Sequence, residues 1–197
     1  MGIIVLETSF HYMEKSMNKR DYKPRLIDRK LEEYLNTFGA VCVEGPKWCG
    51  KTWSSSYHSN SEIMIGNPDG NFQNRQLAEM SPALVLEGES PRLIDEWQEV
   101  PPLWDAVRYK VDQSGEKGQF ILTGSATPNH KGILHSGAGR IARLRMRPMS
   151  LYESGSSSGD ISLEAICTGD APSKITGEVD LRLSLIHISE PTRLDVI

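Results

Sequence analysis

This chain of 197 residues has few cysteines, no long hydrophobic run and only a small excess of negative charge. Its three cysteines are an odd number without the spacing of metal ligands, which argues against a disulfide framework and favours a reducing, cytoplasmic setting. The one apolar run near the start, residues 3–6, is too short for a signal peptide or a membrane span. A formal net charge of −4 argues against a main surface that follows a nucleic-acid backbone. We expect a soluble protein without a membrane partner.

The hydrophobic content of 38% is enough to cover one parallel sheet with helices. Apolar residues at helical spacing predict a helix from Ile27 to Phe38 and another that opens at Pro101 and Pro102. Short apolar runs predict strands at residues 40–43, 63–65, 91–96 and 119–122. Strands that alternate with helices predict a three-layer α/β fold with a mainly parallel sheet, whose ligands bind at the carboxyl ends of the strands.

An octapeptide follows the first predicted strand and fits the pattern G-x-x-x-x-G-K-[ST]. Its residues are Gly45, Pro46, Lys47, Trp48, Cys49, Gly50, Lys51 and Thr52. A loop that leaves a strand and enters a helix directs successive backbone N–H groups into one concavity, which can hold the phosphates of ATP. We expect Lys51 to contact the β- and γ-phosphates and Thr52 to bind Mg²⁺. The alternative is an ordinary connection between a strand and a turn.

Two adjacent carboxylates, Asp95 and Glu96, end the third predicted strand. In a phosphate-loop protein the acid at the end of a neighbouring strand binds the Mg²⁺ that bridges the β- and γ-oxygens, which is the role we expect for Asp95. Because side chains alternate along a strand, Glu96 would face beyond the γ-phosphate and activate a water. The alternative is that both acids cap the strand and begin the next turn.

Three further polar residues are catalytic candidates. Thr123 and Ser125 follow the fourth strand, where they could contact the γ-phosphate or hold the attacking water, although a Thr-Gly-Ser turn explains the same residues equally well. Arg140 could stabilise charge on the transferring phosphate, in its own subunit or in a neighbour. After it, residues 141–147 alternate and predict a strand whose arginine face is solvated or docks a protein or nucleic-acid partner.

Four ordered segments, residues 45–52, 93–99, 122–125 and 139–153, together resemble bacterial and archaeal AAA-type ATP-binding proteins. The resemblance is to the group that carries a C-terminal domain of unknown function, numbered 4143. It implies a P-loop NTPase core of the AAA-like type, with Glu96 as the water-activating residue. It also implies that one strand is inserted between the loop strand and the Asp95 strand.

The expected organisation has a leader, an ATPase domain and a linker. Residues 1–21 show no sustained helical or strand periodicity, and the native start of translation could be Met17. Residues 22–153 are the expected ATPase domain, and residues 154–182 begin with a Ser/Gly-rich passage toward the family's C-terminal domain.

The tail, residues 183–197, resembles the in-frame translation of a sequencing-library adapter. The alternative is a genuine strand at residues 183–188. Under the adapter interpretation the gene is cut near Arg182, and the C-terminal domain, the expected partner in cis, is missing.

The function that these motifs predict is Mg²⁺-dependent ATP binding and hydrolysis. Three alternatives remain: a non-hydrolysing ATP switch, a GTPase suggested by the N-K-x-D pattern at residues 18–21, and a kinase of nucleotides or metabolites. The N-K-x-D pattern precedes the phosphate loop, whereas in GTP-binding folds it follows the loop. For the kinase alternative, no segment indicates the second substrate pocket that a kinase needs.

Overall fold

The computed structural model describes residues 22–125 and 134–170. In chain order the elements are α1 (Asp28–Leu35), β1 (Ala40–Gly45), α2 (Lys51–Tyr57), β2 (Ser61–Met64), α3 (Asp69–Met80), α4 (Pro82–Val85), β3 (Arg92–Asp95), the 3₁₀ turn η2 (Trp97–Glu99), α5 (Pro102–Ser114), β4 (Phe120–Ser125), β5 (Ile141–Arg145) and α6 (Leu163–Thr168). The helix predicted at residues 27–38 is α1, and the one predicted after Pro101 is α5.

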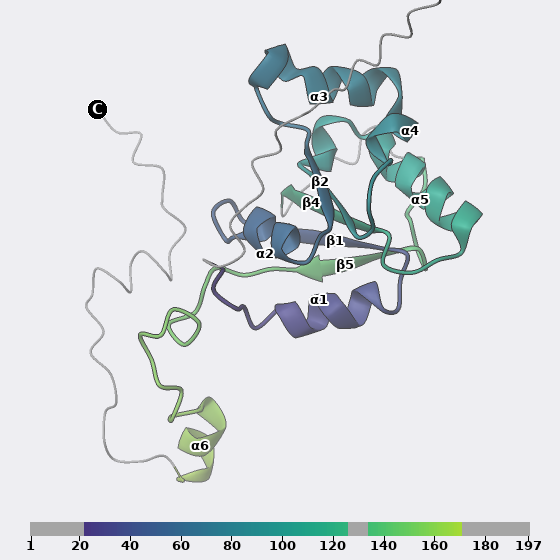
Figure 1. Ribbon diagram of the computed structural model, residues 1–197. Coiled ribbons are helices and arrows are strands. Elements are labelled where there is room, and N and C mark those ends of the chain that lie inside the picture. The colour runs from purple at the N-terminus through teal and green to yellow at the C-terminus, as the bar shows by residue number, and fades with distance from the viewer. Residues whose placement is uncertain (1–21, 126–133, 171–197) are drawn as a thin grey trace, which may run out of the picture.

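The five strands form one parallel sheet in the order β2-β3-β4-β1-β5 (Figure 1). This sheet confirms the predicted α/β class and the expectation that one strand, β4, lies between β1 and β3. In the β1–β4 pair Val43 lies opposite Thr123, and Gly45 lies opposite Ser125. Because all strands run in the same direction, the predicted phosphate loop and the carboxyl ends of β3 and β4 meet at one edge of the sheet.

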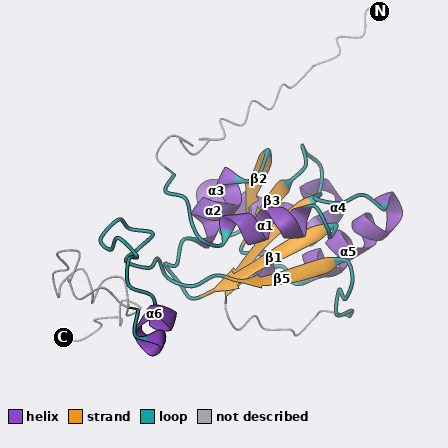
Figure 2. Cartoon of the chain, turned by 90° about the horizontal axis from the view of Figure 1, so that it is seen from below, coloured by secondary structure: helices purple, strands orange, loops and turns teal. Residues whose placement is uncertain are grey.

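Helices cover both faces of the sheet (Figure 2), which confirms the predicted three layers. Alternate residues of β1 face opposite ways. Val41 and Val43 contact the cluster that includes Leu31 of α1, while Ala40 and Cys42 belong to the cluster under α5. Burial of both faces explains why β1 reads as a continuous apolar run.

Helix α5 packs on the face of the sheet opposite α1. Its side chains at helical spacing, Leu103, Trp104, Val107 and Val111, are all buried. Trp104 packs against Trp97 of η2, with 4.9 Å between the ring centroids. This aromatic pair fixes η2, and therefore the residues directly after β3, against the sheet.

The segment 123–125, for which a turn was an equal alternative, belongs to β4 and pairs with the end of β1. The turn interpretation is therefore wrong. The arginine-bearing strand is β5, an edge strand on which Arg143 and Arg145 are exposed, as the alternating pattern predicted.

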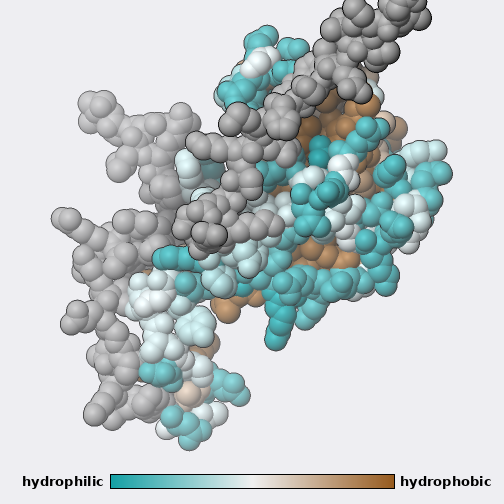
Figure 3. Space-filling model, in the orientation of Figure 1, coloured by the Kyte–Doolittle hydropathy of each residue, from teal (hydrophilic) through white to brown (hydrophobic). Residues whose placement is uncertain are grey.

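Hydrophobic surface in Figure 3 is most evident over α4. Leu77 and Met80 of α3 and Leu84 of α4 are exposed hydrophobic side chains in that region. In residues 22–125 and 134–170, no helix is both long enough and apolar enough to cross a membrane.

Candidate functional site

The predicted phosphate loop connects β1 to α2. Lys51, the first residue of α2, is only 9% exposed, and its Nζ donates hydrogen bonds of 2.9 Å to the carbonyls of Gly45 and Pro46. The ammonium group therefore lies over the loop, where it can exchange these carbonyls for the oxygens of an anion. Three ammonium protons allow such multiple contacts.

The two loop glycines are required by close approach and backbone angle. A Cβ on Gly45 would lie 2.5 Å from the carbonyl oxygen of Met146, and Gly50 has a φ of +96°. Gly50 is the residue before α2, so the left-handed turn at this position directs the chain into the helix. The N-terminal end of a helix such as α2 favours negative charge.

The variable loop residues differ in exposure. Trp48 has a φ of 70° and is 76% exposed, with Lys47 Nζ 5.4 Å from its ring centroid. Cys49 is buried against the loop, since its Sγ would lie 2.9 Å from a Cβ on Gly45. Burial raises the pKa of the Cys49 thiol, which keeps it neutral at neutral pH.

Asp95 connects three elements at the carboxyl edge of the sheet. Its Oδ1 accepts hydrogen bonds from the Thr52 hydroxyl at 2.8 Å and from the Thr123 hydroxyl at 2.5 Å. Thr52 belongs to α2, Asp95 to β3 and Thr123 to β4. Thus the structure brings together the two predicted metal ligands, Thr52 and Asp95, and one predicted catalytic residue.

Glu96 lies beside this group, but strand alternation is the wrong reason for its direction. Strand β3 ends at Asp95, and Glu96 adopts the left-handed conformation, with φ 58° and ψ 44°. Its backbone N–H donates to the Thr123 hydroxyl at 3.1 Å, and its carboxylate accepts from Gln98 Nε2. A non-glycine residue in this conformation costs about 1–2 kcal/mol, and such strain concentrates at functional sites.

Ser125 and Arg140 have different positions. The backbone of Ser125 ends β4 opposite Gly45, close to the loop. Arg140 precedes β5, and its carbonyl accepts from the N–H of Ala40 at the start of β1, which is the opposite edge of the sheet. Its Nε donates to Asp112 at 2.6 Å, and this contact holds the pKa of Asp112 below its ordinary value. The structure therefore does not place Arg140 at the phosphate loop of its own chain.

The polar groups present fit Mg²⁺ bound together with nucleotide phosphates. Across the part of the chain that is described, no cluster of three or more His, Cys, Asp or Glu side chains could hold a metal ion. The Thr52 hydroxyl and the Asp95 carboxylate instead offer a sparse oxygen set. Mg²⁺ commonly takes one or two protein oxygens and completes its shell with phosphates and water.

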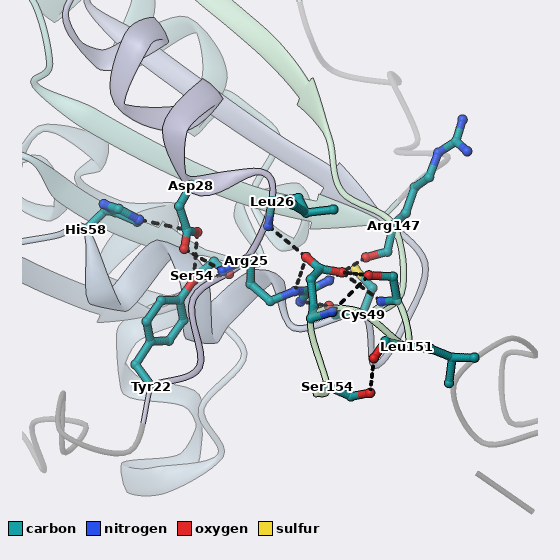
Figure 4. A network of polar contacts seen from close by, with 12 residues as sticks. Tyr22, Arg25, Leu26, Asp28, Cys49, Ser54, His58, Arg147, Leu151 and Ser154 are labelled. Atoms are coloured by element: carbon teal, nitrogen blue, oxygen red, sulfur yellow. Dashed lines mark hydrogen bonds and ion pairs between the residues drawn. The ribbon is translucent and has the colours of Figure 1, made fainter. Parts of the chain in front are cut away.

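Sequence reasoning missed Arg25, which lies behind the loop (Figure 4). Its Nη1 donates to the Cys49 carbonyl at 2.8 Å, and its Nε pairs with Glu153 at 3.0 Å. Glu153 and Gln98 lie in the segments 139–153 and 93–99 that carry the family resemblance, but the sequence assigns neither of them a role. An arginine 20 residues before the loop has no sequence signal, because the contact depends on long-range packing.

A glycine-bent loop between a buried strand and a helix, with a lysine and a neighbouring acid, defines a P-loop nucleotide-binding fold. The AAA domain family matches residues 37–155, more than half of the chain, and the chain belongs to this family.

Two curated relatives share 30% identity with this chain over an alignment of 146 residues that covers 68% of the chain. They are the uncharacterized proteins Mb2031c of Mycobacterium bovis and Rv2008c of Mycobacterium tuberculosis. The chain spans 32% of the length of each relative. The 4143-type C-terminal domain and the adapter-derived tail stay predictions, and residues 1–21 with the N-K-x-D pattern lie outside the described residues.

Proposed function

We propose that this chain binds ATP with Mg²⁺ and hydrolyses it to ADP and phosphate. The observation that carries the proposal is the convergence of Lys51, Thr52 and Asp95 on one loop edge, with the Thr52 hydroxyl 2.8 Å from Asp95. Family membership supports a nucleotide-binding function of the ATPase type. The nucleotide would also couple to further domains of a longer protein, as the relatives' length suggests.

In this proposal the loop binds and orients the triphosphate. Lys51 and the backbone N–H groups around Gly50 bind the β- and γ-phosphates, and Thr52 and Asp95 hold Mg²⁺. When bound, Mg²⁺ neutralises charge on the β- and γ-oxygens. Positioning and charge neutralisation account for most of the catalysis, since phosphoryl transfer needs little covalent help from protein.

Glu96 is the proposed base. A water oxygen attacks the γ-phosphorus, the bond to the β,γ-bridging oxygen breaks, and the Glu96 carboxylate accepts a proton from the water. The Thr123 hydroxyl fixes the Glu96 backbone, and Gln98 contacts its carboxylate. Thr123, together with Ser125 at the end of β4, could also contact the γ-phosphate or the attacking water.

The test compares wild type with E96Q, K51M and the matched control E99Q. Glu99 is an exposed acid three residues from Glu96, paired with Arg75. We expect E96Q to bind a fluorescent ATP analogue like wild type but to release phosphate about 100-fold more slowly. K51M loses a charge-assisted hydrogen bond and should bind about 10- to 100-fold more weakly. E99Q should match wild type in both assays.

Four outcomes would change the proposal. Unchanged phosphate release by E96Q would reject Glu96 as the base. Binding without release by wild type itself would favour the non-hydrolysing switch, in which the Gln98 contact keeps Glu96 from water. Unchanged binding by K51M would reject the site. Competition by unlabelled GTP as effective as that by ATP would favour the GTPase alternative.

A further inference from the structure

Arg25 connects three parts of the chain that are far apart in sequence. Its guanidinium donates to the Cys49 carbonyl at 2.8 Å, the Arg147 carbonyl at 2.9 Å and Glu153 Oε1 at 3.0 Å. Figure 4 shows this arrangement between the loop and the segment that leaves β5. Arg25 is 8% exposed, so these contacts form in a largely dry environment.

The contact with Cys49 orients a peptide of the phosphate loop. The peptide between Cys49 and Gly50 is planar, and in a trans peptide the C=O and N–H groups point in opposite directions. Because the Cys49 carbonyl points toward Arg25, the Gly50 N–H points away from it. Arg25 Nη1 would also lie 2.9 Å from a Cβ on Gly50, so the guanidinium packs directly against this glycine.

The other end of the contact is the segment after β5. Glu153 Oε2 accepts from the Ser150 N–H at 2.7 Å and from its hydroxyl at 2.8 Å, while Oε1 accepts from the Leu26 N–H at 2.8 Å. Burial alone would raise the pKa of Glu153, but these N–H and O–H donors and Arg25 hold it below its ordinary value. Glu153 is therefore ionised, and its side chain is only 7% exposed.

The backbone of Arg25 is fixed by its own neighbours. Its N–H donates to Asp28 Oδ2 at 2.7 Å, and the Tyr22 hydroxyl contacts both Asp28 Oδ1 at 2.7 Å and Ser54 Oγ at 2.9 Å. Ser54 belongs to α2, the helix that begins in the loop. The segment 22–28 thus contacts the loop, α2 and the segment that follows β5.

We propose that Arg25 is a positioning residue that couples the phosphate loop to residues 147–154, so that nucleotide binding and the packing of this segment stabilise each other. The proposal rests on the proposed nucleotide binding. It adds the contact through which that binding would affect the residues that follow β5. A buried charge left without its partner is strongly unfavourable, so the Arg25–Glu153 pair forms or separates as a unit. Reciprocal stabilisation follows from linkage between the two sites.

The experiment measures hydrogen–deuterium exchange and nucleotide affinity on the full chain. In wild type, a fluorescent ATP analogue with Mg²⁺ should slow exchange of the Ser150 and Leu26 amides, which donate to Glu153. E153Q and R25K should bind the analogue about tenfold more weakly, and the nucleotide should protect residues 147–154 less. E79Q, which changes an exposed acid paired with Arg75, should behave like wild type.

A milder variant, S150A, removes one hydroxyl donor to Glu153 and should weaken binding of the ATP analogue about two- to threefold. It serves if E153Q does not fold, and the wild-type exchange measurement needs no variant. Nucleotide binding without protection at Ser150, or wild-type affinity in folded E153Q, would overturn the coupling alone. Absence of nucleotide binding in wild type would overturn the proposed function and the coupling together.

Discussion

Replacing Thr123 by valine removes one hydroxyl and keeps the shape of the side chain. Thr123 is fully buried, and its hydroxyl donates to Asp95 at 2.5 Å and accepts from the Glu96 N–H at 3.1 Å. A hydrogen bond to a charged group contributes about 1.5–3 kcal/mol, and an ordinary one about 0.5–1.5 kcal/mol. We expect T123V to lower the free energy of unfolding by about 2–4.5 kcal/mol, the sum of these two contributions.

Thermal and urea denaturation, followed by circular dichroism, measure this loss. A change of 1 kcal/mol moves the melting temperature of a domain of this size by about 4 °C, so T123V should melt roughly 8–18 °C lower than wild type. The matched variant T123S keeps the hydroxyl and loses a methyl group, at about 0.5–1.5 kcal/mol. The expected order of stability is therefore wild type, T123S, T123V.

The refuting result is equally clear. If T123V is as stable as wild type, the hydroxyl between Asp95 and Glu96 contributes nothing measurable. The arrangement of β3 and β4 at the site would then have to be maintained by packing alone. Mg²⁺-dependent affinity for the ATP analogue should fall in T123V as well, because Asp95 loses a donor that orients it.

Two further predictions use the buried ionisable groups. Iodoacetamide should modify exposed Cys167 in the native protein. It should react with Cys42 and Cys49 only after unfolding, since both are buried and burial raises the pKa of both thiols. Peptide mass spectrometry measures the labelling, and equal labelling of Cys49 and Cys167 in the native protein would contradict this prediction. Burial alone would raise the pKa of Asp28 and Glu153, but hydrogen bonds outweigh it and hold both below their ordinary values of 3.8 and 4.5. Their stabilisation is present above these values and is lost as pH falls through the lowered ones, so the melting temperature should drop below pH 4.5, and E153Q should reduce that drop. An identical drop in E153Q would exclude Glu153 as a source.

Much of the fold followed from local patterns. The apolar run at 40–43 predicted β1 because a strand buried on both faces needs hydrophobic residues in succession, and the helical spacing from Leu103 to Val111 predicted the buried side of α5. The contact of Thr52 with Asp95 was predictable because parallel strands deliver their carboxyl ends to one edge.

Other features depended on contacts between distant residues. Glu96 turns by a left-handed backbone and not by strand alternation, because η2 packs through Trp97 immediately after β3. Arg140 offered the right chemistry, but the register of β5 against β1 places it at the edge opposite the loop. Neither the direction of Glu96 nor the location of Arg140 could be predicted from the residues next to them in the sequence.

The linear order of residues was enough to predict the phosphate loop, its lysine and its neighbouring acid, because each of these depends on local backbone geometry or on the common direction of the strands. Only tertiary structure could join Arg25 to Cys49 and Glu153, which lie 24 and 128 positions away in the chain. A guanidinium gains such partners only where packing has already brought separate segments together and removed the water between them.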